Sequence, residues 1–177
     1  WFEIEIEKRG VINVKIDKKR KIPVTVLLRA FGMESDSEIL AAFKGNKDVL
    51  AKHIGPTIDK DKTKTRMEAL YAIYKLLRPG DLGTDERVQD LFQTTFLDPK
   101  KFDLGEVARI KINRKIGRDL AYDDQSRFLS LDDLIGGLQY LMGLVYEEPN
   151  HHWDDIDHLE NRRVRSVGEL VYDKIKV

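Results

Sequence analysis

Hydrophobic and charged residues alternate at the start of the chain. Residues 2–6 place apolar side chains between glutamates, which is typical of a strand with one buried and one exposed face. A Lys-Arg-Gly sequence at 8–10 suits a tight turn, and a second alternating run occupies residues 12–16. The pattern predicts an antiparallel β-hairpin over residues 1–16.

The rest of the chain shows mostly helical periodicity. Residues 24–31 follow Pro23 and favour a short helix, although their β-branched side chains leave a strand open. Apolar residues then recur every three or four positions after residues that commonly cap helices. The predicted helix starts are at Ser35, Thr65, Thr84, Asp103, Ser130 and Ser166.

Glycine and proline predict where the helices end. A short helix over 47–54 should close at the Gly-Pro pair 55–56, and a polar loop should occupy 57–64. Another helix should end at the Arg-Pro-Gly sequence 78–80, because proline disfavours helical backbone at the preceding residue. The glycine pair 136–137, inside the last long helix, predicts close packing against another helix.

These elements predict an α+β fold: a mainly helical body with a small antiparallel β-hairpin or sheet near the N-terminus. We expect a hairpin and basic segment at 1–32, a helical body at 33–149, and a charged motif with a terminal helix at 150–177. A length of 177 residues suits one compact domain. The chain has no cysteine, which excludes disulfides and thiolate nucleophiles and favours a reducing compartment. It also lacks a long apolar run and a signal-peptide pattern, so we expect a soluble chain without a membrane partner.

Positive and negative charges are segregated along the chain although they cancel overall, with 31 basic and 31 acidic residues. Residues 8–21 and 100–118 are strongly basic, whereas 119–160 hold eleven acidic residues and one arginine. The basic run Lys18, Lys19, Arg20 and Lys21 could contact phosphates or could simply be a solvated loop. Arg78 at a helix exit could be positioned for an anion or could neutralise the helix dipole.

Histidines and aspartates are densest between residues 151 and 158, where they could bind a metal ion or serve magnesium-dependent phosphoryl transfer. The candidate ligands are His151, His152, Asp154, Asp155, Asp157 and His158. Their spacing matches no zinc motif, and the chain has no phosphate-binding loop or nucleophile-elbow motif. Ion pairs with the arginines that follow are the simpler interpretation.

Residues 154–170, DDIDHLENRRVRSVGEL, resemble a stretch of the bacterial RNA polymerase beta subunit. Further stretches agree with that family in the same order along the chain. They are WFEIE at 1–5, IDKKRKIPVTVLLRAFG at 16–32, LRPG at 77–80 and DPKKFDL at 98–104. The resemblance therefore spans nearly the whole chain, and the loop 57–64, the segment 118–130 and the last six residues lie outside it.

This resemblance implies roles for individual residues. In the family this region is the lobe, one jaw of the cleft that holds downstream DNA, and it contains no catalytic residue. Trp1, Asp157 and Arg162 match positions that contact the non-template strand. Basic positions facing DNA are matched by Lys18, Lys19, Arg20, Lys21, Arg78 and Lys101. Arg163 and Arg165 belong to the same motif, and Arg165 could instead anchor the lobe. Glu160 replaces a usual glycine, which would add negative charge and strain the turn.

The resemblance thus implies a lobe of DNA-directed RNA polymerase that clamps downstream duplex and contacts the non-template strand. As part of a nucleotidyltransferase it would be inactive alone and hold no cofactor, because magnesium belongs to the partner beta-prime subunit. Its expected partners are DNA, the beta-prime and alpha subunits and sigma factor, in the bacterial cytoplasm at the nucleoid. Two alternatives stay open. One is a protein-interaction domain that docks sigma or regulators through residues 119–160, and the other is an independent metal-dependent phosphotransferase.

Overall fold

The computed structural model describes residues 2–17, 20–45, 47–162 and 164–175. The chain forms two units, residues 1–142 and residues 143–177. Mainly helical structure with a small antiparallel sheet near the N-terminus confirms the predicted α+β class. Within the described residues, no helix is both long and apolar enough to cross a membrane.

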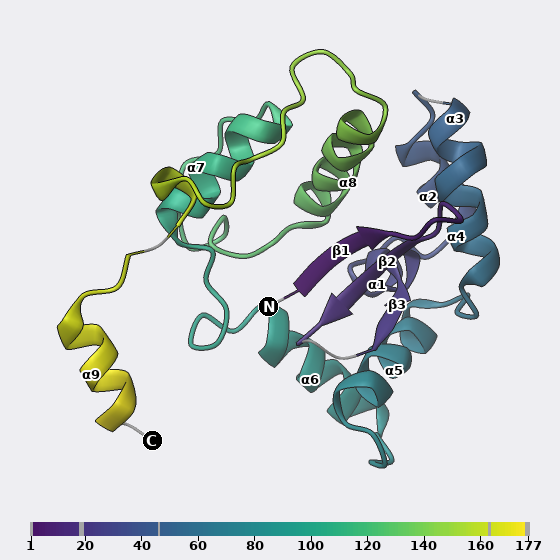
Figure 1. Ribbon diagram of the computed structural model, residues 1–177. Coiled ribbons are helices and arrows are strands. Elements are labelled where there is room, and N and C mark those ends of the chain that lie inside the picture. The colour runs from purple at the N-terminus through teal and green to yellow at the C-terminus, as the bar shows by residue number, and fades with distance from the viewer. Residues whose placement is uncertain (1, 18–19, 46, 163, 176–177) are drawn as a thin grey trace. The chain divides into compact units, whose positions relative to one another are not determined.

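The sheet consists of β1 (Phe2–Ile6), β2 (Ile12–Ile16) and β3 (Lys21–Pro23), in the antiparallel order β1-β2-β3 (Figure 1). The predicted hairpin is confirmed, with Ile4 opposite Val14. Sequence analysis missed β3, because its three residues lie at the end of the basic run and are too few to show alternation. As the central strand, β2 is the most buried of the three.

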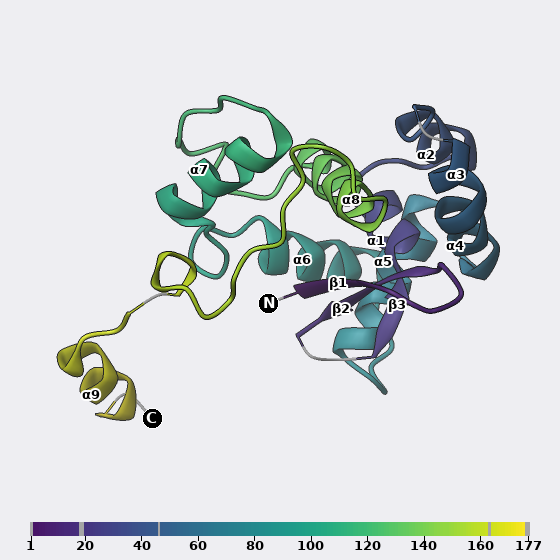
Figure 2. The same ribbon diagram turned by 45° about the horizontal axis from the view of Figure 1, so that its top comes forward.

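Three helices form the core with the sheet. They are α1 (Val24–Ala30), α5 (Arg66–Leu77) and α6 (Asp85–Phe96). Every residue of α1 is buried, because it lies against the sheet and packs on α5, as Figures 1 and 2 show. Phe31, just beyond α1, meets Phe92 and Phe96 of α6 edge-to-face, at ring-centroid distances of 5.1 and 5.6 Å. Burial therefore decides the ambiguous segment 24–31 in favour of a helix.

Residues 35–61 differ from the prediction. After α2 (Asp36–Ala42), α3 (Lys47–Val49), a π-helix (Leu50–Ile54) and α4 (Gly55–Lys60) follow one another without a break. The predictions of a helix end at 55–56 and of a polar loop from 57 are therefore wrong. Pro56 is tolerated within this continuous segment because it directly follows the π-helix and lies in the first turn of α4, which is the helical position that proline favours. The Thr57 hydroxyl donates to His53 O at 2.6 Å and accepts from Ile12 N at 2.9 Å, which ties this helical segment to β2.

The predicted helix starts agree with the structure, with small differences. The Ser35, Thr65, Ser130 and Ser166 hydroxyls each accept a hydrogen bond from the backbone N–H three residues later. Thr84 precedes α6 but makes no such bond. The helix expected at Asp103 is α7 (Gly105–Ile116), which begins two residues later.

The last helices are α8 (Leu131–Val145) and α9 (Val167–Ile175), with a short 3₁₀ turn at Leu159–Asn161 between them. A Cβ atom on Gly136 would lie 3.1 Å from Ile116, so Gly136 allows α7 and α8 to approach closely. This confirms close packing for Gly136. Gly137 has open space around it, so the prediction for that residue is wrong.

Candidate nucleic-acid interface

Three cationic side chains line one surface pocket of about 330 Å³ in the first unit. Arg78 follows α5, Arg87 lies on α6 and Lys101 lies in the segment between α6 and α7. Asp90, Leu91 and Thr94 of α6 complete the lining. The pocket therefore brings together two predicted DNA-contacting residues, Arg78 and Lys101, that are 23 positions apart.

Local backbone geometry fixes where each cation sits. Helix α5 ends at Arg78, whose N–H still donates to Tyr74 O at 2.8 Å, and Pro79 prevents continuation. Lys101 closes a turn by donating its N–H to Asp98 O at 2.9 Å. Arg87 projects from the polar face of α6, opposite the buried Val88 and Phe92.

Sequence analysis did not single out Arg87. A usable signal was present, because residues 87, 90, 91 and 94 are spaced by three and four positions and so share one face of a helix. Nothing in the sequence, however, indicated that Arg78 and Lys101 flank that same face.

The basic run near the sheet is only partly described. Lys18 and Lys19 lie outside the described residues, as does Trp1. Arg20 is exposed, whereas Lys21 forms an ion pair with Glu5 of β1. Lys15 approaches Glu5 to 2.8 Å from the neighbouring strand position. Hydrogen bonds from Lys15 and Lys21 hold the pKa of Glu5 below its ordinary value, so part of the charge of Lys21 is already neutralised.

In the second unit, Asp157 and Arg162 are neighbours. Arg162 Nη1 lies 3.4 Å from Asp157 Oδ1, and both side chains are exposed. The turn between them is held by Asn161 Nδ2, which donates to Asp155 O at 2.8 Å. The structure therefore brings together two of the three residues predicted to contact the non-template strand. Arg163 lies outside the described residues.

Glu160 does not strain this turn. It occupies the middle of the 3₁₀ turn with a negative φ, and its N–H donates to His158 Nδ1 at 3.2 Å. The expected strain from replacing glycine is therefore wrong, because a 3₁₀ turn accepts any L-residue.

Arg165 donates to Asp173 Oδ2 of α9 at 2.9 Å, so it connects the motif to the terminal helix. The ring of His151 packs against Gly143, where an added Cβ would lie 2.5 Å from it. Within the described ranges no group of three or more His, Asp or Glu side chains is arranged to hold a metal ion. Within this cluster, Asp155 and His158 accept hydrogen bonds from backbone N–H groups of their own loop.

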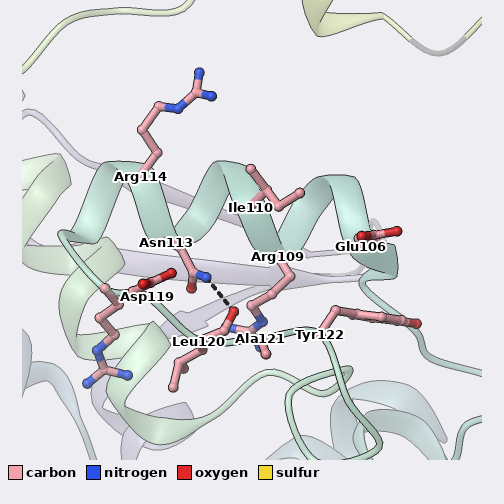
Figure 3. A pocket seen from close by; sticks show the side chains of 10 residues that line it. Glu106, Arg109, Ile110, Asn113, Arg114, Asp119, Leu120, Ala121 and Tyr122 are labelled. Atoms are coloured by element: carbon pink, nitrogen blue, oxygen red, sulfur yellow. Dashed lines mark hydrogen bonds between the residues drawn. The ribbon is translucent and has the colours of Figure 1, made fainter.

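A second pocket of about 580 Å³ lies between α7 and residues 118–122 (Figure 3). From α7, Arg109 and Asn113 point toward residues 120 and 121, and Asn113 Nδ2 donates to Leu120 O at 2.7 Å. Arg109 is buried and forms an ion pair of 2.9 Å with Asp133. These contacts fold the segment 118–130, in which no motif was recognised, onto α7 and α8.

Comparison with known proteins places these sites in context. Residues 1–165 match the family model described as RNA polymerase Rpb2, domain 2. The DNA-directed RNA polymerase subunit beta of Syntrophomonas wolfei is 40% identical over 176 residues, covering 99% of this chain and 15% of that protein. The subunit from Rubrobacter xylanophilus is 38% identical over 190 residues, covering 100% of this chain and 16% of that protein. That from a Synechocystis strain is 42% identical over 177 residues, covering 100% and 15%.

Proposed function

Because the chain belongs to the RNA polymerase Rpb2 domain 2 family, we propose that it is the lobe region of a bacterial-type RNA polymerase beta subunit. In this proposal it clamps downstream duplex DNA and contacts the non-template strand during transcription. The observation that carries the proposal is the convergence of Arg78, Arg87 and Lys101 on one pocket. Arginine and lysine neutralise backbone phosphates and release the counterions condensed on DNA, so this surface would supply salt-dependent affinity.

Asp157 and Arg162 would add base contacts to this non-specific attraction. A carboxylate accepts hydrogen bonds from the donors on a guanine edge, and an arginine binds a base edge or a phosphate. Both side chains are exposed. Their ion pair, with 3.4 Å between Arg162 Nη1 and Asp157 Oδ1, lies at the surface, where such pairs contribute little stability. A nucleic acid could therefore replace it at low cost. Trp1 would stack on an unpaired base.

The chain spans 15–16% of the length of the relatives compared above, so the enzyme's activity would belong to the larger assembly. We propose that nucleotidyl transfer and the magnesium ions lie in the partner beta-prime subunit, and that this chain alone is inactive. The beta-prime and alpha subunits and sigma factor would be its protein partners, in the bacterial cytoplasm at the nucleoid.

Fluorescence anisotropy with a labelled fork DNA tests this function. We expect the chain to bind the fork with an affinity that falls steeply as salt rises. Changing Lys18, Lys19 and Arg20 together to Ala should weaken binding and flatten the salt dependence. Changing Arg114 to Ala, an exposed arginine of α7, is the control. Absence of DNA binding by the unchanged chain would contradict the proposal.

A second candidate function is docking of sigma factor or another regulator. It is favoured by the exposed apolar side chains of Ile110, Leu120 and Tyr122 around the pocket of Figure 3, beside the exposed Asp119. Ile110→Asp should abolish binding of a purified sigma factor if this face docks it, and should leave fork binding unchanged. The reverse result would favour the DNA-binding role alone.

A further inference from the structure

We propose that Arg78, Arg87 and Lys101 form a binding site for one backbone phosphate of DNA, in which Arg87 is the residue that completes the site. This inference rests on the proposed function, because it assigns a particular ligand group to one part of the DNA-facing surface. It goes beyond that function by assigning the three cations to a single phosphate group and by giving Arg87 a specific share in binding it.

The charge available at the pocket favours an anionic ligand. Arg78, Arg87 and Lys101 are exposed, and none of them forms an ion pair with any described residue. Most of the other arginines whose side-chain contacts are described already form ion pairs with carboxylates. Arg29, Arg109, Arg118, Arg127, Arg162 and Arg165 all pair with carboxylates of the chain. Three exposed cations that have no carboxylate partner among the described residues therefore distinguish this pocket, although Arg78 also interacts with the Tyr74 hydroxyl.

The chemistry of the lining matches a phosphate group. The guanidinium groups of Arg78 and Arg87 offer paired N–H donors that match phosphate oxygens, and the Lys101 ammonium offers a point charge. The Thr94 hydroxyl is a further neutral donor, and Leu91 is the apolar member of the lining. One carboxylate, Asp90, leaves a formal charge of +2 on the lining residues, which suits a phosphodiester.

The backbone of the pocket is preorganised for binding. Arg87 and Thr94 are seven positions apart on α6, so the helix fixes both on one face about two turns apart. Arg78 and Lys101 are each fixed by a chain turn, at Arg78-Pro79 and at Asp98–Lys101. Binding a phosphate therefore requires ordering of side chains but no rearrangement of the backbone.

Fork-DNA affinity at several salt concentrations tests the site in the 177-residue chain. Removing one phosphate contact lowers the slope of log affinity against log salt by about one. We expect this reduction, with binding about fivefold weaker at physiological salt, for Arg87→Ala. Arg114→Ala removes the same charge from a solvent-exposed position of α7 outside the pocket and is the matched control. Asp90→Asn should strengthen binding, because it removes the only negative charge from the lining.

A phosphate scan locates the contact. Replacing single phosphates of the fork with uncharged methylphosphonates should reveal one position at which the chemical change weakens binding of the unchanged chain but not of Arg87→Ala. Two results would overturn the phosphate site while leaving the proposed function intact. One is that the affinity losses from the methylphosphonate and from Arg87→Ala add at every position, and the other is that Arg87→Ala leaves the slope of log affinity against log salt unchanged. Failure of the unchanged chain to bind the fork would instead overturn the proposed function. Circular dichroism of each variant verifies that the helices are retained.

Discussion

Arg29 and Asp61 form a buried ion pair, in which Arg29 Nε lies 3.1 Å from Asp61 Oδ2. Arg29 also donates to Glu34 O and pairs with Asp36, so this one side chain joins α1 to the start of α2 and the end of α4. Removing one partner of a buried pair leaves an uncompensated charge, which typically costs about 3–5 kcal/mol.

Arg29→Ala should therefore lower the free energy of unfolding by about 3–5 kcal/mol, measured by urea denaturation. The control is Lys60→Ala, which breaks an exposed pair of 3.2 Å with Glu7 and should cost less than about 1 kcal/mol. An equal loss of unfolding free energy in the two variants would show that the buried pair stabilises the chain no more than the exposed pair does.

Arg109 should hold the segment 118–130 in place. Besides its pair with Asp133, it donates to Ser126 O and Phe128 O, each at 2.7 Å. Arg109→Ala should cost up to about 3–5 kcal/mol, because the buried Asp133 then keeps only its longer contact of 3.8 Å with Arg118. Hydrogen exchange should also speed up in residues 120–130 while β1 and β2 keep their protection. Uniform loss of protection would instead indicate global destabilisation.

Asp103 should make the free energy of unfolding depend on pH in the acidic range. Hydrogen bonds from Arg127, from the Gly105 N–H and from Tyr122 lower the pKa of Asp103 to about 2. Since this folded-state pKa lies below the value of about 3.9 for an unfolded aspartate, the stabilisation is complete above pH 4 and disappears as the pH falls toward 2. Asp103→Asn should thus be less stable than the unchanged chain at pH 7, and the difference should shrink by pH 2. Urea denaturation at several pH values measures this, and Asp119→Asn serves as an exposed control.

Gly10 should not tolerate a side chain. Its φ is +86°, and a Cβ atom would lie 2.1 Å from Lys52 O. Gly10→Ala should therefore destabilise the chain by more than about 1 kcal/mol, in contrast to Gly45→Ala, where a Cβ meets open space and φ is not positive. A thermal denaturation series compares the two, and a similar midpoint for both would contradict the assigned role of Gly10.

Residues 151–158 should bind no divalent ion stoichiometrically. In calorimetric titrations with magnesium, manganese and zinc, we expect no saturable uptake, because Asp155 accepts from the Asp157 N–H, Asp157 pairs with Arg162, and His151 packs on Gly143. Saturable one-to-one binding, lost in Asp155→Asn, would revive the phosphotransferase alternative.

Local chemistry in the sequence predicted much of the fold. Hairpin alternation and hydroxyl caps depend on neighbours within about four residues, so they can be read from the sequence directly. The continuous helical segment at 47–60 could not be predicted in this way. A Gly-Pro pair normally indicates the end of a helix, and the sequence does not reveal that a π-helix precedes Pro56 and places it in the first turn of α4. Asp61 was assigned to a polar loop for the same reason, although burial beside Arg29 makes it part of the core.

The candidate interface was only partly predictable. Resemblance to a family supplied Arg78 and Lys101 separately, but their shared pocket depends on how α5 and α6 pack. Arg87 could be identified as a residue of this pocket only from the packing of α5 and α6. The ion pair of Asp157 with Arg162 could have been predicted from the sequence, since the two residues are only five positions apart, across one 3₁₀ turn.

The hydrogen bonds that hold the tip of the hairpin have a consequence for folding during synthesis on the ribosome. His53 Nδ1 donates to Gly10 O at 2.9 Å, and Thr57 accepts from Ile12 N, across 43 and 45 positions of sequence. A hairpin forms within microseconds, whereas a ribosome adds about 5–20 residues per second. The nascent hairpin therefore waits on the order of two seconds or more for the segment that locks it. During that interval its edges are open to wrong partners, and the charged Glu3, Glu5 and Lys15 side chains are its protection against aggregation.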